Sequence, residues 1–440
     1  MAGLPRILVR DALLAGEPPR TGVTLVLEAG RVARVAAAGE PVPSCPGDWE
    51  IDARGRLVVP GRVDAHTHLA AGGLQRVAGL PGRWPGSARG LRVGFRRPLE
   101  ERLDPAAMEA LATAGALAAV RAGVTTVLAL ERGMPGREAE TLEAAERAVR
   151  AVGLRAVLAL GASDLGGPGR AAAAVRAAEA FGRAREGDPR VRGTMGLDGL
   201  HATTRGTLES LAEPARRLGL HASVAEDGSD LERSWALDGQ WPVLLLRQAG
   251  LLHPRTVVAH GSTLGTLEAE ALRDADATLV MTPRAAAFWD AEPASPEILA
   301  AVEPPVALGT DGIFPDLAEE AVALAQRLRR RRSGPPPPDG WVGRSVWETG
   351  AILAGAILGE RLGRIEEGAA ADLAVLEGRP GGAAPEGSDA DVALLWAGAP
   401  AAWGVVGGEV RLREGAPVGV DPREVAARAA EAARRVLSDG

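Results

Sequence analysis

Residues 57–73, LVVPGRVDAHTHLAAGG, form the stretch that decides the fold. An apolar run ends in two histidines one residue apart, His66 and His68, and a glycine-rich segment follows them. On a β-strand, residues i and i+2 share a face and lie about 6.6 Å apart, so both rings can reach one metal ion. The two histidines could also have a purely structural role, but their position directly after a strand favours a metal site at the strand end.

The chain beyond this stretch alternates helix-like and strand-like segments. Three of the pairs are PAAMEALATAGALAAVRAG before VTTVLAL, EAETLEAAERAVRAVG before LRAVLALG, and TLESLAEPARRLG before LHASVAE. Roughly eight such units indicate parallel strands joined by helical crossovers. We therefore predict an α/β fold, a (β/α)₈ TIM-like barrel over residues 58–365. An open doubly wound sheet is the alternative, although no GxGxxG motif follows a first strand.

The two ends of the chain follow a different pattern. Residues 1–57 and 366–440 contain short β-like runs separated by glycine turns, among them TGVTLVLEAGRVARVAAAG and DVALLWAGAPAAWGVVGGEVRLREG. Such runs are typical of paired strands. We expect both ends to join in one small, composite β-sandwich domain beside the barrel.

Composition and charge exclude several classes of protein. The 440 residues are 46% hydrophobic and 24% charged, which is ordinary for a soluble globular enzyme. A net charge of −7 and a pI of about 5.6 argue against nucleic acid or an anionic membrane as the main partner. No apolar window is long enough to predict a membrane span. The first residues lack the pattern of a secretory signal, so the expected location is cytoplasmic.

Cysteine and lysine usage narrows the chemistry further. Cys45 is the single cysteine, so an intrachain disulfide is impossible. All fifty basic residues are arginines, because the sequence contains no lysine. A Schiff base, a catalytic lysine and a carbamylated lysine that bridges two metals are therefore excluded.

Further candidate residues stand at the ends of predicted strands, where barrel enzymes keep their chemistry. They are His201 in GLHA, His221 and Glu226 in LHASVAED, His260 in VVAHGS, and Asp311 in ALGTDG. Five of the six histidines thus fall at predicted strand ends, which core packing does not explain. His253 precedes a proline between a helix and a strand. We expect it to be exposed at the opposite face and give it no role.

Taken together, these segments make the chain resemble a known superfamily. VVPGRVDAHTH, RAGVTTV, GLHA, HASVAEDGSDLE, VVAHG, ALGTDGIFPDL and RLGRIEEGAAADLAVLEG carry the resemblance, which runs nearly end to end. The chain resembles the amidohydrolase superfamily, in the branch of cytosine, guanine and triazine aminohydrolases. Within it, the chain is most similar to aminohydrolases linked to selenium metabolism. The resemblance implies a (β/α)₈ barrel beside a β-sandwich made of both termini.

The resemblance also implies a chemistry. The expected enzyme is a metal-dependent hydrolase of C–N bonds other than peptide bonds, an aminohydrolase (deaminase) of a heterocyclic amine that uses a metal-activated water. His66, His68 and Asp311 would bind one divalent ion. Zinc is the first candidate, and iron and manganese suit the same ligand types. Such an ion lowers the pKa of a bound water towards about 7.

The remaining candidates receive roles from the same resemblance. Asp311 would take a proton from the water that His260 orients, and Glu226 would pass a proton to a ring nitrogen of the substrate. His201 would contact the substrate. The expected partner is a small molecule, and a homodimer stays open because relatives often dimerise.

One strand departs from the family pattern. The family has H-x-H-x-x-E there, and its second histidine is a metal ligand; this chain has Ser223 at that position and His221 at the first. A serine hydroxyl is a poor zinc ligand. Three outcomes are open: three protein ligands with water in the fourth position, recruitment of His221 or His260 as a ligand, or an empty site. The last would make the chain a catalytically degraded relative, a pseudoenzyme or binding module.

A second departure concerns the substrate. VMTPRAAAFWDA stands where relatives carry an N-P-x-S-N-like segment, with Thr282 in place of the first Asn. Either Arg284 and Trp289 reshape the pocket, or a coding bias removed every Asn from the chain and this contact was dispensable. The substrate is therefore not transferred from relatives, and a ring-opening amidase or a chlorohydrolase would use the same site.

Overall fold

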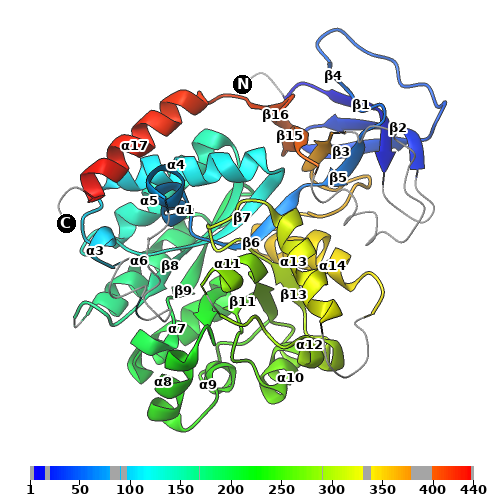
Figure 1. Cartoon of the computed structure of the whole chain (residues 1–440). Helices are drawn as coiled ribbons and strands as arrows, with labels where there is room; N and C mark the ends of the chain where they lie inside the picture. Colours follow the sequence, from blue (N-terminus) through cyan, green and yellow to red (C-terminus); the bar gives the residue numbers. More distant parts are fainter. Residues whose placement is uncertain are drawn as a thin grey trace.

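The computed structural model describes residues 4–14, 20–79, 90, 97–167, 169–289, 291–330, 338–377 and 399–437, and it contains two sheets (Figure 1). One is an eight-stranded parallel sheet in the order β13-β12-β11-β10-β9-β8-β7-β6, curled into a TIM-like barrel. Its strands are β6 (Arg62–Thr67), β7 (Val124–Glu131), β8 (Arg155–Ala162), β9 (Val191–Leu197), β10 (Leu220–Val224), β11 (Thr256–His260), β12 (Thr278–Met281) and β13 (Val306–Leu308).

Helices surround this barrel, as the alternating pattern predicts (Figure 1). They are α1 (Leu69–Ala78), α3 (Arg97–Glu100), α4 (Pro105–Arg121), α5 (Glu138–Val152), α6 (Arg170–Ala184), η2 (Leu200–Ala202), α7 (Arg205–Leu218), α8 (Gly228–Asp238), α9 (Pro242–Gln248), α10 (Thr266–Asp274), α11 (Pro283–Phe288), α12 (Pro296–Val302), α13 (Leu317–Arg329), α14 (Trp341–Trp347) and α15 (Thr349–Leu358). The predicted α/β barrel is confirmed.

Local sequence explains these elements. Every residue of β7 and β8 is buried, because barrel strands face the interior on one side and helices on the other. Their apolar runs are therefore nearly unbroken. Helix α4 begins where the carboxylate of Asp104 accepts a hydrogen bond from the backbone N–H of Ala107 at 2.7 Å, with Pro105 in the first turn.

The first and last barrel strands meet beside the predicted metal site. The backbone N–H groups of Thr310 and Asp311, just after β13, both donate to the carbonyl oxygen of His66 on β6 at 3.0 Å. Gly309 permits this approach, since a Cβ atom there would lie 2.7 Å from that oxygen. The motif ALGTDG therefore closes the barrel and delivers Asp311 to His66.

Both chain ends form the second sheet, as predicted. It has nine strands in the order β17-β16-β15-β14-β5-β1-β2-β3, with β4 paired to β1. The strands are β1 (Ile7–Leu14), β2 (Arg20–Glu28), β3 (Arg31–Ala36), β4 (Trp49–Asp52), β5 (Leu57–Pro60), β14 (Leu373–Leu376), β15 (Ala401–Val406), β16 (Glu409–Arg413) and β17 (Ala416–Pro417). This sheet has its own apolar core. The domain limits, 1–57 with 366–440 and 58–365, stay a proposal.

The last helix leaves this sheet and packs on the barrel. Helix α17 (Pro422–Leu437) lies against α4 and α1 (Figure 1). Ala429, Ala432, Ala433 and Val436 are buried, which is the i, i+3, i+4, i+7 spacing of one helix face. Among the described residues, no helix is both long and apolar enough to cross a membrane.

Candidate metal centre

Three side chains from the first and last barrel strands converge at the C-terminal end of the barrel. The Nε2 atoms of His66 and His68 lie 3.5 Å and 3.2 Å from the same atom, Oδ1 of Asp311. Two ligand atoms on one tetrahedral zinc ion stand about 3.3 Å apart, as bonds of about 2.0–2.1 Å require. The spacing therefore fits a shared ion.

His66 is the centre of a histidine cluster. Its ring centroid lies 5.0 Å from those of His68 and His221 and 4.9 Å from that of His260. His66, His260 and Asp311 each offer a ligand atom within 4.8 Å of the other two. His68 joins this group through Asp311. The structure thus brings His260, predicted to orient water, within reach of the ligand set.

Burial keeps these imidazoles neutral. Loss of solvation lowers the pKa of His66 to about 4 and that of His68 to about 3, because burial penalises the charged ring. Nδ1 of His68 contacts the carbonyl oxygen of Leu130, so that nitrogen carries the proton. Its Nε2 then presents a lone pair to Asp311. Neither Nε2 atom makes a hydrogen bond with any described residue.

The strand that departs from the family pattern, β10, carries both Ser223 and His221. The Ser223 hydroxyl is buried on β10 and has no hydrogen-bond partner among the described residues. His221, two residues deeper, places Nε2 at 2.8 Å from Nδ1 of His66. His221 therefore supports His66 from behind, on the side away from Asp311. Its role as a ligand stays a prediction.

Two of the site residues have unusual backbone angles. His260 and Asp311 have φ values of 78° and 52°, in the left-handed region that residues other than glycine seldom adopt. Such conformations cost of order 1–3 kcal/mol and cluster at functional sites. Gly312, with φ of 73°, follows Asp311 where a Cβ atom would lie 2.6 Å from the carbonyl oxygen of His68.

The predicted proton carrier and substrate contact lie beside this cluster. The Glu226 carboxylate is 4.0 Å from Nε2 of His260, whose Nδ1 is 3.4 Å from the hydroxyl of Thr282. His201 is held by Asp230, which accepts from its backbone N–H at 2.8 Å and from its Nδ1 at 3.3 Å. The backbone N–H of Glu226 also donates to Asp230 at 3.4 Å. The structure therefore brings all the predicted site residues to one end of the barrel.

Sequence reasoning missed the carboxylates that hold the site residues. Asp230 is one, although HASVAEDGSDLE contains it. Asp64 is another: it is buried two residues before His66, and it accepts from the Thr310 hydroxyl at 2.6 Å and from the Thr310 backbone at 3.0 Å. Burial raises the pKa of Asp64 to about 7. The stretch PGRVDAHTH carried the only signal, an acidic residue inside an apolar strand.

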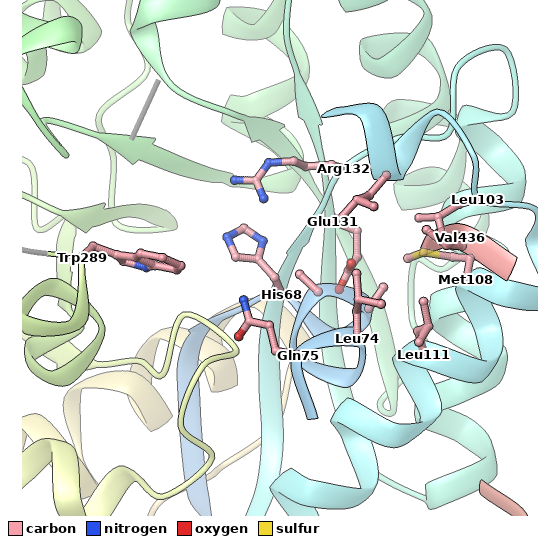
Figure 2. A pocket seen from close by; sticks show the side chains of 13 residues that line it. His68, Leu74, Gln75, Leu103, Met108, Leu111, Glu131, Arg132, Trp289 and Val436 are labelled. Carbon is pink, nitrogen blue, oxygen red and sulfur yellow. The ribbon is translucent and has the colours of Figure 1, made fainter. Parts of the chain in front are cut away.

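The segment that replaces the family's asparagine motif reaches the same site. Trp289, just after α11, donates from Nε1 to Oδ2 of Asp311 at 3.3 Å. The Arg284 guanidinium lies 4.1 Å from the ring centroid of Phe314. Figure 2 shows Trp289 on one side of His68 and the apolar side chains on the other, with Arg132 above the His68 ring and Gln75 below it. Trp289 is thus a wall of the pocket, as expected.

His253 corrects one expectation. It precedes β11, at the end of the barrel opposite the site, as predicted. The prediction that it is exposed was wrong, because the side chain is half-buried. Its Nδ1 accepts a hydrogen bond from the backbone N–H of Arg255 at 3.2 Å, which closes the turn into the strand.

Solved structures share this fold across the whole chain. A zinc-bound adenosine deaminase from Xanthomonas campestris has a TM-score of 0.80 at 18% identity, with 98% of each chain covered. An atrazine chlorohydrolase from Arthrobacter aurescens complexed with zinc has a TM-score of 0.76 at 20% identity, over 97% of this chain and 100% of that one. At such identities the likeness establishes the fold alone.

Relatives in sequence are named as deaminases. A 5-methylthioadenosine/S-adenosylhomocysteine deaminase of Archaeoglobus fulgidus is 28% identical, over 89% of this chain and 90% of the relative. A 5'-deoxyadenosine deaminase of Methanothermobacter thermautotrophicus is 26% identical over 81% of each. These relatives support a hydrolytic enzyme that acts on C–N bonds, as the sequence predicts.

The family assignment rests on most of the chain. The sequence model of the amidohydrolase family matches residues 57–411, from the strand before the His66 stretch to the end sheet. The matched part includes every residue of the candidate metal centre. The predicted resemblance to the aminohydrolase branch of the amidohydrolase superfamily is confirmed, and this chain belongs to the amidohydrolase family.

Proposed function

We propose that this chain is a metal-dependent aminohydrolase that replaces the amino group of a heterocyclic amine by oxygen and releases ammonia. One observation carries the proposal. Neutral imidazole nitrogens of His66 and His68 face one oxygen of Asp311 at 3.5 Å and 3.2 Å. The lone pair on Nε2 of His68 repels the carboxylate that it faces, so a cation between these atoms would turn the repulsion into attraction.

The donor set fits a zinc ion. Imidazole and carboxylate are ordinary zinc ligands, and a catalytic zinc site keeps three protein ligands and one open position. His66, His68 and Asp311 would hold the ion, and His260 is the nearest further donor. When bound, the ion would act as a Lewis acid and make water nucleophilic near neutral pH. Iron or manganese would suit the same atoms.

The side chains around this centre can move the protons that the reaction requires. Asp311 would accept a proton from the attacking water while Trp289 holds its second oxygen. Glu226 would deliver a proton to the substrate ring nitrogen, so that the amine leaves as ammonia. His201, oriented by Asp230, would contact the substrate. Asp311, Glu226 and His201 follow the barrel strands β13, β10 and β9, where barrel enzymes keep their chemistry.

The relatives suggest where to look for the substrate. They are named for methylthioadenosine, S-adenosylhomocysteine and deoxyadenosine, which share the 6-amino group of adenine. We infer that a purine amine is the first class to assay. The net charge of −7 makes a nucleic-acid partner unfavourable. We expect a cytoplasmic location, and a homodimer stays open.

Metal content and ammonia release together test the proposal. The purified protein should contain about one zinc per chain and release ammonia from at least one purine, pyrimidine or pterin amine. His66→Gln and Asp311→Asn should each lose the metal and lower kcat/KM by at least about 1,000-fold. His253→Gln is the matched control, since it removes a histidine at the opposite end of the barrel and should retain both. A protein without stoichiometric metal and without turnover would refute the proposal.

Ser223 favours one second candidate, a binding protein that has lost catalysis. A buried serine hydroxyl without a hydrogen-bond partner stands where the family pattern has a ligand. This candidate predicts a bound ion or amine without ammonia release. Turnover that zinc restores to the chelated protein would exclude it.

A further inference from the structure

A cavity opens directly beside the metal centre, on the side of α1. Its volume is about 60 Å³, enough for several water molecules or a small chemical group. His68 and Trp289, which both contact Asp311, form its inner wall (Figure 2). Two of the residues that line the cavity therefore also contact the candidate metal centre.

The far end of the cavity is apolar. It is formed by α1, the segment before α4, α4 itself and the C-terminal helix α17 (Figure 2). The side chains there are Leu74, Leu99, Leu103, Met108, Leu111 and Val436. An apolar group that enters this end gains the free energy of leaving water, whereas a charged group would lose its hydration without a counter-ion.

The polar groups of the cavity lie near His68. The two charged side chains among them, Glu131 and Arg132, already form hydrogen bonds within the protein. The Glu131 carboxylate accepts a hydrogen bond from the backbone N–H of Leu69 at 2.6 Å. Arg132 donates from Nε to Asp198 at 2.8 Å, and both side chains are 8% exposed. Since Arg132 is already neutralised by Asp198, it does not demand an anionic ligand.

Gln75 contributes a hydrogen-bond acceptor that none of these contacts uses. Its Oε1 atom is buried and has no hydrogen-bond partner among the described residues. Figure 2 shows its amide group beside His68, on the opposite side of the ring from Arg132. A buried acceptor of this kind costs free energy until a donor reaches it. A hydroxyl or N–H group in the middle of a ligand would be that donor.

We propose, on the basis of the aminohydrolase function above, that the cavity selects substrates by an uncharged apolar arm. The substrate class is a heterocyclic amine with a hydrogen-bond donor in its middle part and an aliphatic or thioether group at its far end. A zwitterionic amino-acid tail does not fit this cavity. The chain therefore discriminates between methylthioadenosine and S-adenosylhomocysteine, which stand together in the names of several relatives.

Three nucleosides with the same adenine amine test the arm alone. Adenosine ends in a hydroxyl, methylthioadenosine in a methylthio group, and S-adenosylhomocysteine in an amino-acid tail. With the zinc-loaded enzyme, kcat/KM for methylthioadenosine should exceed kcat/KM for adenosine and for S-adenosylhomocysteine by at least about tenfold, mainly through a lower KM. Filling an apolar pocket with one or two more heavy atoms predicts a difference of this size. Leu74→Trp, which fills the cavity, should bring this ratio close to one. Val77→Trp is the matched control on the same helix outside the cavity, and it should preserve the ratio.

Calorimetric binding of the same three compounds separates this inference from the proposed function. Turnover without a preference for methylthioadenosine, or a preference that survives Leu74→Trp, would overturn the inference and leave the aminohydrolase standing. Tighter binding of methylthioadenosine that Leu74→Trp abolishes, without ammonia release, would support the cavity assignment and refute the aminohydrolase. Equal or absent binding of all three would overturn the cavity assignment.

Discussion

At position 223 the fifth barrel strand offers a hydroxyl where the family pattern has an imidazole. Ser223 pairs in register with Ala259, one residue before His260, and it lies two residues after His221 on the same face of the strand. His221 is committed to Nδ1 of His66 at 2.8 Å. With no imidazole at 223, the ion would depend on His66, His68 and Asp311, with His260 as the nearest further donor.

Restoring the histidine tests this view of the ligand set. Ser223→His should raise zinc affinity by about 10- to 100-fold, because it adds an imidazole nitrogen as a further ligand. Such nitrogens bind zinc at about 2.0–2.1 Å. Competition with a chromogenic chelator measures the affinity, and elemental analysis measures the stoichiometry. Ser223→Val is the control, since it fills similar space without a donor. Equal zinc affinity in the histidine and valine variants would show that position 223 does not face the ion.

The sequence pointed to candidate residues but not to the contacts among them. His66, His68, Glu226, His260 and Asp311 were chosen because each ends a strand-like run, and the structure brings His66, His260 and Asp311 within reach of one another. The hydrogen bond between His66 and His221 joins residues 155 positions apart, and its existence depends on ring orientation inside the closed barrel. Asp230 was missed for the same reason.

Among the helices, α13 carries a buried acid close to the site. Glu320 is fully buried and accepts from the backbone N–H of Arg284 at 2.9 Å, which anchors α11. Its Oε1 atom has no hydrogen-bond partner among the described residues. Burial raises the pKa of Glu320 to about 8, and the negative charges of Asp64 and Asp311 act in the same direction.

This pKa predicts how stability depends on pH. The folded protein binds the Glu320 proton more tightly than the unfolded chain, whose glutamate has a pKa of 4.5. The contribution to stability is complete below about pH 4.5, falls as pH rises, and is lost above about pH 8. The loss is roughly 5 kcal/mol in the free energy of unfolding, since each pKa unit is worth about 1.4 kcal/mol.

Glu320→Gln should remove this dependence and keep the hydrogen bond from Arg284. The variant should match the natural protein near pH 4.5 and exceed it in urea midpoint at pH 9. Glu319→Gln, on the exposed side of the same helix, is the control and should follow the natural pH profile. A Glu320→Gln profile parallel to that of the natural protein would show that Glu320 does not titrate in this range.

Element positions were predictable where one pattern dominated. Strands such as β7 and β8 are buried throughout, so their apolar runs were visible in the sequence. Strand β13 has three residues, and only the motif after it marked its place. The amphipathic pattern of α17 predicted a helix, but not the surface of α1 and α4 that it covers, because that choice depends on where the end sheet releases the chain.

At the scale of the whole molecule, a buried ion pair joins the barrel to the sheet of chain ends. Arg155, at the start of β8, donates to the Asp372 carboxylate at 2.7 Å and 3.2 Å, just before β14. The two side chains are 4% and 3% exposed. Asp372 also accepts from the backbone N–H of Gly407 at 2.6 Å, in the turn between β15 and β16. One carboxylate thus fastens two strands of the end sheet to the barrel.

Removing this carboxylate should loosen the molecule as a whole. Asp372→Ala should lower the free energy of unfolding by about 3–5 kcal/mol, because it leaves the Arg155 guanidinium buried without its counter-ion. Urea denaturation followed by tryptophan fluorescence measures the loss. Glu179→Ala, which breaks the surface ion pairs of Glu179 with Arg183 and Arg217, is the control and should cost no more than about 1 kcal/mol. The double variant Arg155→Met with Asp372→Leu should recover most of the loss, since neither buried charge remains. If Asp372→Ala unfolds at the same urea concentration as Glu179→Ala, the end sheet is held to the barrel by apolar contacts and not by this ion pair.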